Sequence, residues 1–358
     1  KRNSIDGSNP DQTAPQLLRA YAVDNFNITL IFDEPISTVN AAVTANYTVS
    51  DGIGNPVSAT AVAPAYNSIQ LVLANALQPG KVYTVTAAPG ITDCGNNSVA
   101  GIKNTARVGL AEITVDSFDI VINEILFNPK PTSNDYVEIY NRSNKILDLK
   151  NVSIANASGF THLSTETYLF FPGDFMVITN SRDLVLHDYV ANDLYAFIEV
   201  STPSYNDDAG DVLLLNEQGK IIDEVKYLDD WHFPLIHDEE GVSLERIDYN
   251  APSQNAANWH SAATNVGYGT PTYKNSQFRL DGGVSGQVSV EPEIFSPDND
   301  GRDDFATINY NFPEPGYVAN ISIFDAVGRK VRNLQRNALC GVKGYFRWDG
   351  LDEKNQKL

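Results

Sequence analysis

Apolar residues recur at every second position in many short stretches of this chain. Ile28, Leu30 and Phe32 show this spacing, and residues 69–73 and 83–85 repeat it. Side chains on a strand point alternately to its two faces, so each stretch has one face for a core and one for solvent. Asp-Gly and Pro-Gly turns separate the stretches at short intervals. The pattern predicts an all-β fold of short strands packed in layers.

The length of the chain indicates more than one folding unit. Its 358 residues exceed what a single sandwich needs and suffice for two or three domains. With 42% hydrophobic and 20% charged residues, the composition is that of a folded protein. We therefore expect tandem immunoglobulin-like β-sandwiches, with a linker and a first sandwich in 1–112, a second in 113–277, a linker in 278–290 and a third in 291–358.

The first of these segments carries three recognisable turns. IFDEPIS (31–37), LQPGKVYTV (77–85) and Asp93-Cys94-Gly95-Asn96 follow one another in that order. This order resembles the bacterial Ig-like domains of S-layer and large adhesin-type proteins. The resemblance implies a spacer or stalk.

The second segment contains the most specific motifs. NEI (123–125), DYVEIYN (135–141) and LDL (147–149) come first, and GDVLLL (210–215) precedes a hairpin turned at Gly219. The series resembles the lamin tail domain, an immunoglobulin-like sandwich, although Asn151-Val152 stands where many members have Gly-Trp. The resemblance implies a module that binds and spaces and has no catalytic apparatus of its own. A short helix is expected at 181–190, with Ser181 as its N-cap.

The third segment begins with EPEIFSPDNDGRDDF (291–305) and continues with Asp-x-x-Gly-Arg (325–329) and Trp-Asp-Gly (348–350). It resembles the C-terminal Ig-like domains of flagellar hook-capping proteins and the gliding-associated domains of Bacteroidetes secreted proteins. Such domains normally continue with a further strand, so we expect a truncated sandwich or an unusual edge.

The acidic loop of this segment is the best candidate for a metal site. Calcium prefers oxygen ligands, and a glycine turn at Gly301 can point alternate residues inward. Asp298, Asp300 and Asp304 would supply carboxylates and Arg302 its carbonyl oxygen. The alternative is a set of turns in which the carboxylates cap backbone amides. The Asn206–Asp211 stretch has the same two interpretations.

A loop rich in histidine and acid is a second candidate. Residues 229–240 contain His232 and His237 among five acids, with Trp231 and Phe233 beside them. The spacing matches no zinc motif, so a solvated loop with an aromatic anchor is the plainer interpretation. As a binding site it would use Trp231, His232, Phe233 and His237.

The net charge of the chain limits the classes of partner that we expect, and the two cysteines are not expected to form a disulfide. The net charge of −20 disfavours nucleic acid and anionic membranes, and no apolar run is long enough to span a bilayer. Cys94 and Cys340 lie in different expected domains and are predicted to be free, half-buried thiols. The chain begins in a polar stretch without a visible signal peptide, as a processed or expressed fragment would.

Three hypotheses for function follow. The first is a non-enzymatic secreted or cell-surface protein whose lamin-tail segment binds a protein or glycan. The second is an accessory region of a larger extracellular hydrolase, such as a nuclease or phosphatase. The third is a metal-dependent hydrolase that uses His232 and His237. The sequence contains no G-x-S-x-G, P-loop, dinucleotide fingerprint or H-E-x-x-H motif, which favours the first.

Overall fold

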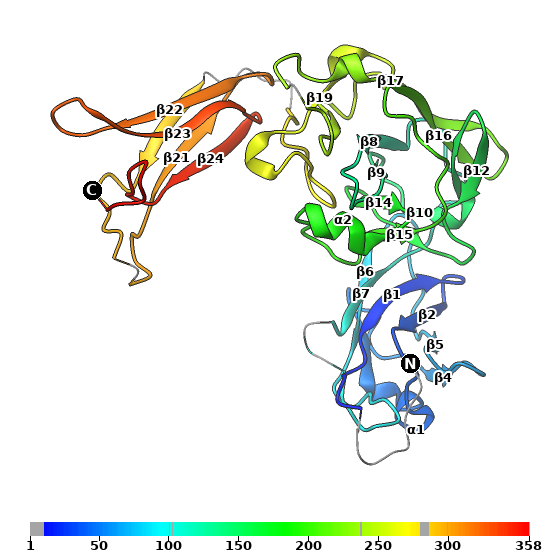
Figure 1. Ribbon diagram of the computed structural model, residues 1–358. Coiled ribbons are helices and arrows are strands. Elements are labelled where there is room, and N and C mark those ends of the chain that lie inside the picture. Colours follow the sequence, from blue (N-terminus) through cyan, green and yellow to red (C-terminus); the bar gives the residue numbers. More distant parts are fainter. Residues whose placement is uncertain are drawn as a thin grey trace. The chain divides into compact units, whose positions relative to one another are not determined.

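The structure, a computed structural model, describes residues 11–99, 101, 103–236, 238–279, 286–298 and 300–357 (Figure 1). Strands dominate the chain and its helices are short, which confirms the predicted all-β class. The chain divides into two compact units, described separately here. The first comprises Lys1–Asp119, Ser143–Val152 and Ser164–Asp174, and the second Ile120–Arg142, Ser153–Leu163 and Phe175–Leu358.

The first unit is built from two main sheets and a small two-stranded sheet. The four-stranded sheet has the order β1-β2-β5-β4, the three-stranded sheet the order β3-β6-β7, and β10 pairs with β13. The elements are β1 (Leu17–Ala22), β2 (Asn27–Phe32), α1 (Thr38–Ala41), η1 (Thr44–Asn46), β3 (Tyr47–Val49), β4 (Ser58–Ala61), β5 (Ser68–Val72), β6 (Tyr83–Ala87), β7 (Thr105–Val108), β10 (Leu147–Asp148), η2 (Leu149–Asn151) and β13 (Leu169–Phe170).

The alternating positions of these strands form the core of the first unit. Ile28 and Leu30 from β2, Ile69 and Leu71 from β5 and Val85 from β6 are all fully buried. The strands β1 and β7 bring the two main sheets together, so their inner faces share one apolar layer. The period-two prediction is confirmed here.

The second unit begins with a six-stranded sheet of order β15-β14-β9-β8-β18-β19 and a four-stranded sheet of order β12-β11-β16-β17. The strands β8 and β17 bring these two sheets into contact. The elements are β8 (Ile120–Leu126), β9 (Tyr136–Asn141), β11 (Val152–Asn156), β12 (Gly159–His162), β14 (Phe175–Thr179), α2 (Arg182–Asp188), β15 (Phe197–Glu199), β16 (Ala209–Asn216), β17 (Ile221–Leu228), η3 (Asp229–Trp231), β18 (Leu244–Arg246), η4 (Ala256–Asn258), β19 (Trp259–Ser261) and η5 (Thr264–Val266).

The hairpin predicted at Gly219 and the helix predicted at 181–190 are both present in the second unit. The strands β16 and β17 form the expected hairpin, and Gly219 turns it with a φ of 72°, a left-handed conformation that suits glycine. The helix α2 lies where it was expected and Ser181 precedes it, but the Ser181 side chain makes no capping hydrogen bond. The predicted N-cap position of Ser181 is therefore confirmed, without a side-chain hydrogen bond to the helix.

The C-terminal part of the second unit is a pair of small sheets, β20-β21-β24 and β22-β23. Its few buried residues include Tyr310, Cys340 and Phe346, and every residue of β20 is exposed. The elements are β20 (Gln287–Glu291), β21 (Ala306–Asn311), β22 (Val318–Phe324), β23 (Lys330–Leu339) and β24 (Lys343–Trp348).

The two compact units cut across the domain boundaries expected from the sequence. Residues 143–152 and 164–174, expected within the second sandwich, belong to the first unit, while 291–358 belong to the second unit. The boundaries at 112, 277 and 290 stay predictions.

The two cysteines form no disulfide with each other. Cys94 and Cys340 are free, as predicted, but Cys94 is exposed and Cys340 buried, so neither is half-buried. Among the residues that the structure describes, no helix has both the length and the apolar character needed to cross a bilayer.

Candidate functional site

The loop after β17 is fixed to the sheet by one serine. Ser261, on β19, is fully buried. Its Oγ lies 2.8 Å from Nδ1 of His232 and accepts a hydrogen bond from the backbone N–H of Phe233 at 2.9 Å. Two consecutive loop residues are thus held by one side chain of a neighbouring strand. The loop has a defined position although it contains only one short 3₁₀ helix, η3.

His232 belongs to the interior and not to the surface of this loop. It is 3% exposed and packs against Phe127, with ring centroids 5.5 Å apart. Burial lowers the pKa of His232 to about 4, so the imidazole is neutral at pH 7. The sequence hypothesis of His232 as a contact residue therefore needs correction, because the ring supports the loop from beneath. His237 lies outside the described residues.

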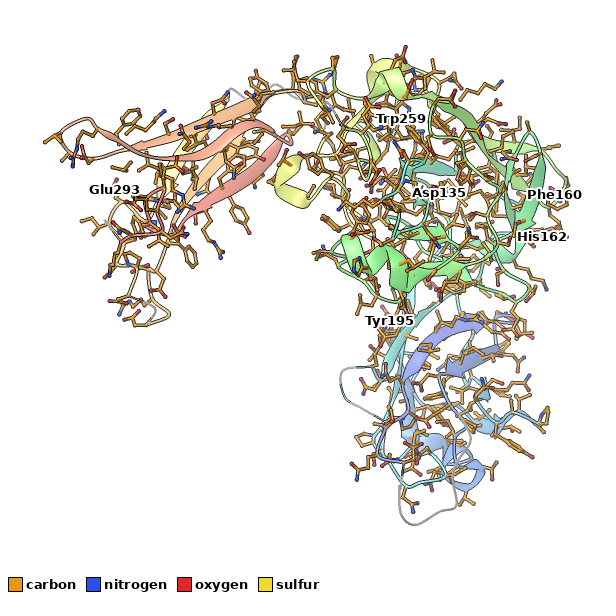
Figure 2. All side chains as sticks on the ribbon, viewed as in Figure 1. Asp135, Phe160, His162, Tyr195, Trp259 and Glu293 are labelled. Atoms are coloured by element: carbon orange, nitrogen blue, oxygen red, sulfur yellow. The ribbon has the colours of Figure 1, made fainter. Side chains whose placement is uncertain are left out.

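Trp231, Phe233 and Leu235 keep surface on the same loop. Trp231 stacks with Trp259 at 6.5 Å, and Phe233 lies 5.3 Å from the ring of His260. Trp259 is the first residue of β19 (Figure 2). Trp231 and Phe233 are half-buried, while Leu235 is 61% exposed. The loop therefore presents apolar surface on a fixed backbone.

Three buried glutamates form the most unusual feature of the second unit. Glu124 on β8 pairs in register with Glu138 on β9 and with Glu245 on β18. All three side chains are fully buried. Burial of a carboxylate is costly unless hydrogen bonds or protonation compensate it. Such a row requires a dense set of donors.

The donors come mainly from the segment that follows β19. The backbone N–H of Thr270 donates to Glu124 at 2.9 Å and that of Gln277 to Glu245 at 2.8 Å. The backbone N–H of Thr272 donates to Glu138 at 2.5 Å. The three carboxyl groups therefore clamp residues 270–277 against the sheet.

The hydroxyl group of Thr270 lies between two of the glutamates and bears on whether they are protonated. Thr270 Oγ1 lies 3.0 Å from Oε2 of Glu124 and 2.8 Å from Oε1 of Glu245. A threonine hydroxyl has one hydrogen and can donate to only one of these oxygens. The other contact is a hydrogen bond only if that carboxyl group is protonated and donates to Thr270. Both contacts are hydrogen bonds only when the pair carries at least one proton.

The pKa shifts agree with this count. Burial, and then the neighbouring charge of Glu124, raise the pKa of Glu245 to about 8. Burial also raises the pKa of Glu124, and burial with the charge of Glu124 raises that of Glu138 well above its usual value. The three glutamates are thus kept in the interior by hydrogen bonds and by their raised pKa values. Their role in this structure is to hold residues 270–277 against the sheet.

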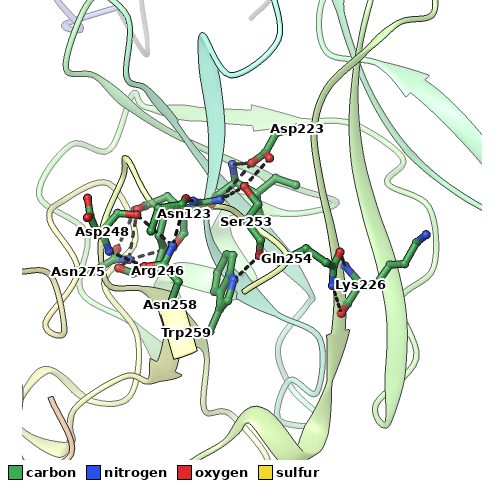
Figure 3. Close-up of polar contacts among 12 residues, drawn as sticks. Asn123, Asp223, Lys226, Arg246, Asp248, Ser253, Gln254, Asn258, Trp259 and Asn275 are labelled. Atoms are coloured by element: carbon green, nitrogen blue, oxygen red, sulfur yellow. Dashed lines mark hydrogen bonds and ion pairs between the residues drawn. The ribbon is translucent and has the colours of Figure 1, made fainter. Parts of the chain in front are cut away.

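A buried ion pair lies on the other side of the same strands (Figure 3). Arg246 is fully buried, and its Nη2 lies 3.2 Å from Oδ2 of Asp223. The Nε of Arg246 donates to the carbonyl of Ile122 at 2.7 Å, and its Nη2 contacts the hydroxyl of Ser253. Burial lowers the pKa of Arg246 to about 10, so the guanidinium stays charged at pH 7.

A signal for these buried groups exists in the sequence. Glu124 and Glu138 stand in the largely apolar stretches IVINEIL (120–126) and YVEIYN (136–141), and Glu245 and Arg246 lie between Leu244 and Ile247. In β8 every position is buried, including Asn123 and Glu124, so alternation could not assign a face to either residue. A charged residue inside an apolar strand is the pattern that identifies such a network.

The acidic loop of the C-terminal part brings together three of the predicted calcium ligands. Carboxylate oxygens of Asp298, Asp300 and Asp304 all lie within 4.8 Å of one another. Gly301 has a φ of 86°, as the expected sharp turn requires. Calcium binds oxygen at about 2.3–2.6 Å, so ligand atoms in one sphere are separated by at most about 5 Å. The three carboxylates meet that limit.

The same carboxylates also cap backbone amides. The N–H of Arg302 donates to Asp300 at 2.8 Å, that of Gly301 to Asp304 at 2.9 Å and that of Asp300 to Asp298 at 3.2 Å. The structure therefore contains the turn geometry of the alternative interpretation as well. The two are compatible, because each carboxylate has further lone pairs. In the stretch at 206–211, Asp208 caps the N–H of Ala209 at 2.8 Å as the chain enters β16.

Comparison with known proteins identifies two segments. Residues 4–107 match the sequence family described as bacterial Ig-like domain. Residues 114–229 match the family described as lamin tail domain. A search of curated proteins finds no match to the chain.

Similar solved structures are distant from this chain. The N-terminal part of the bacterial S-layer protein SbsC is 17% identical with a TM-score of 0.26, over 46% of this chain and 40% of that one. The S-layer protein rSbsC(31-844) is 12% identical with a TM-score of 0.25, over 94% and 63%. A DUF4876 family protein from Bacteroides thetaiotaomicron is 13% identical with a TM-score of 0.26, over 64% and 86%.

The chain thus spans less than two thirds of the two S-layer structures. Scores this low define neither the fold nor the role of this chain. The S-layer, flagellar and gliding-associated resemblances of the flanking segments stay predictions. Two segments of this chain therefore match sequence families: residues 4–107 match the bacterial Ig-like domain, and residues 114–229 match the lamin tail domain.

Proposed function

We propose that this protein is a non-enzymatic, secreted or cell-surface multidomain protein in which the lamin-tail segment binds a protein or glycan. The bacterial Ig-like domain would act as a spacer. The lamin tail and Ig-like families are typically non-catalytic, which supports this role. Its ligand-binding surface would include the loop after β17.

The observation that carries the proposal is the fixed loop at 229–236. Ser261 holds the backbone at His232 and Phe233, while Leu235 stays 61% exposed beside the half-buried rings of Trp231 and Phe233. A fixed loop loses little conformational entropy on binding, and partly exposed aromatic rings are the typical anchors of protein interfaces. Contact residues also lie more often on loops than on the strands that support them.

A binding screen tests the proposal. The full 358-residue chain would be applied to glycan and protein arrays, and any spot bound would be retested with Leu235→Ser. Leu194→Ser is the matched control, because Leu194 is 52% exposed on a different loop. We expect Leu235→Ser to weaken binding at least about threefold, since hot-spot truncation commonly costs more than about 1 kcal/mol. An array without bound ligand, or equal binding by both variants, would contradict this surface.

We also propose a calcium ion at the acidic loop, bound by Asp298, Asp300 and Asp304 and by the carbonyl oxygen of Arg302. The support is the grouping of the three carboxylates around the turn at Gly301. Ligands from one tight turn would tie the loop together, so the expected role is structural.

A further inference from the structure

A cavity of about 520 Å³ opens between the end of the lamin-tail segment and the C-terminal sheets, within the second compact unit. One wall comes from residues 273–276, 278 and 279, which overlap the end of the segment clamped by the glutamates. The other comes from residues 311–313 at the end of β21 and from 342–343 at the start of β24. A cavity of this size, formed where two parts of a chain meet, has the dimensions and location typical of small-molecule sites.

One backbone hydrogen bond joins the two walls, and another holds the two strands of the second wall together. The N–H of Val342 donates to the carbonyl of Ser276 at 2.8 Å, and the N–H of Phe312 donates to the carbonyl of Val342 at 2.7 Å. Ser276 is in turn held by its hydroxyl, which donates to the buried Glu245 at 2.7 Å. The cavity therefore has preformed walls and does not depend on a ligand for its shape.

The charged residues that line the cavity are all basic. They are Lys274, Arg279 and Lys343, and the described lining includes no acid. This is unusual in a chain with 45 acidic and 25 basic residues. The carboxylate of Glu314 lies 3.7 Å from Nη1 of the lining residue Arg279 and is 70% exposed. The lining thus attracts an anion locally while the protein as a whole repels polyanions.

Aromatic rings complete the lining. Phe278 and Phe312 are both half-buried. The ammonium group of Lys274 lies 4.8 Å from the centroid of Phe278, and Phe312 stacks on Tyr317 at 4.5 Å. Phe278 also stacks on Tyr249 at 4.3 Å and Phe312 on Tyr310 at 5.0 Å, so neighbouring groups cover the faces of these two rings. The half-buried ring of Tyr273, which also lines the cavity, is the aromatic surface left to pack against a ligand beside positive charge. Asn311 adds an amide group that can hydrogen-bond to a polar ligand.

We propose that this cavity binds a sugar that carries a carboxylate, such as a uronic acid residue. The carboxylate would contact the ammonium groups of Lys274 and Lys343, the C–H face of the sugar ring would stack on an aromatic ring, and its hydroxyl groups would bond to the amide of Asn311. The cavity is separate from the loop at 229–236. The inference rests on the proposed function only in treating this part of the chain as a binding module.

A monocarboxylate fits the site better than a nucleotide. Phosphate groups are commonly bound by backbone N–H groups at helix N-termini or in glycine-rich loops, and the cavity is lined by strand ends and a loop without such an element. A dianion would also meet a larger repulsion from a chain of net charge −20. An extended peptide needs a long groove, whereas this cavity holds one or two rings.

Calorimetric titration of the full chain with glucuronic acid tests the proposal, with glucose as the neutral probe and AMP as the nucleotide probe. The double variant Lys274→Gln/Lys343→Gln removes two exposed cations of the lining. Lys330→Gln is the matched control, because Lys330 is exposed on β23 in the same part of the chain and does not line the cavity. Melting curves of all variants establish that each is folded.

We expect glucuronic acid to bind, glucose not to bind, and the double variant to lose at least about tenfold in affinity because two charge contacts are removed. Lys330→Gln should change affinity less than about twofold, as for a distant surface charge. Binding of AMP without glucuronic acid would overturn the sugar assignment, and glucuronic acid binding that survives the double variant would overturn the location. No binding of any probe would overturn the site. Leu235→Ser should leave glucuronic acid binding unchanged, so failure at the cavity and failure at the loop can be told apart.

Discussion

The guanidinium of Arg246 lies 3.2 Å from the carboxylate of Asp223, and neither side chain reaches solvent to any extent. The pair joins β17 to β18, which belong to the four-stranded and the six-stranded sheet of the second unit. A buried charge that loses its partner costs far more than a surface charge does. The pair is therefore a place where a single substitution has a large effect on stability.

Arg246→Met should reduce the free energy of unfolding by about 3–5 kcal/mol, because it leaves the Asp223 carboxylate buried without its counter-ion. Urea unfolding followed by tryptophan fluorescence measures the change. Arg329→Met is the control, since the side chain of Arg329 is 81% exposed in its pair with Asp325, and its urea midpoint should stay nearly unchanged. Equal midpoints for the two variants would show that the buried pair does not stabilise the fold.

The buried glutamates give the stability a characteristic dependence on pH. The pKa of Glu245 rises from 4.5 to about 8 on folding. The folded state therefore holds a proton that the unfolded state has released, and the stabilising contribution, fully present below pH 4.5, is lost as the pH rises towards 8. Measured between pH 6.5 and 8, the free energy of unfolding should decrease.

Glu245→Gln should remove much of that decrease. Its amide N–H₂ can donate to Thr270 Oγ1 without a titrating proton, and its amide oxygen can still accept from the N–H of Gln277. Urea unfolding at a series of pH values would compare this variant with Glu217→Gln, a substitution of an exposed glutamate. A slope that persists in Glu245→Gln would place the extra proton on another group.

His232 contributes with the opposite sign at lower pH. Its pKa falls from 6.5 to about 4 on folding because of burial, so its contribution is present above pH 6.5 and is lost as the pH falls towards 4. In NMR titrations the His232 ring should titrate near pH 4, whereas its resonances would move near pH 6.5 if the ring were exposed. His232→Gln should flatten the loss of stability between pH 6.5 and 4, and His187→Gln, at an exposed ring, should not.

Calcium should raise a thermal transition of this protein if it binds at the acidic loop. A ligand that binds only the folded state stabilises it by mass action. Scanning calorimetry with and without excess calcium should show the shift in the wild-type chain and no shift in Asp298→Asn/Asp300→Asn. Asp183→Asn, which changes an exposed acid on α2, is the control. Superimposable melting curves with and without calcium would contradict calcium binding at the acidic loop.

Much of the fold could be predicted from the sequence because its signals are local. Alternation placed β2, β5 and β6, and the turn at Gly219 placed the hairpin β16–β17. Alternation failed in β8, since both of its faces are buried and every position looks alike. The partition of residues 143–152 and 164–174 into the first unit depends on contacts between distant segments, which no local pattern records.

The candidate sites likewise differ in whether their residues are close together in sequence. The acidic loop was found because its ligands are neighbours in sequence, and the three carboxylates do lie together. The role of His232 was missed because its partner, Ser261, stands 29 residues away. The clamp of Glu124, Glu138 and Glu245 and the basic cavity were missed for the same reason: they combine residues from separate segments.

The free thiols offer a practical consequence. Cys94 is exposed and belongs to the first compact unit, whereas Cys340 is buried in the second. A maleimide dye added to the native protein should therefore attach at one position, without any engineered cysteine. The fluorescence of that label would then come from the first compact unit alone.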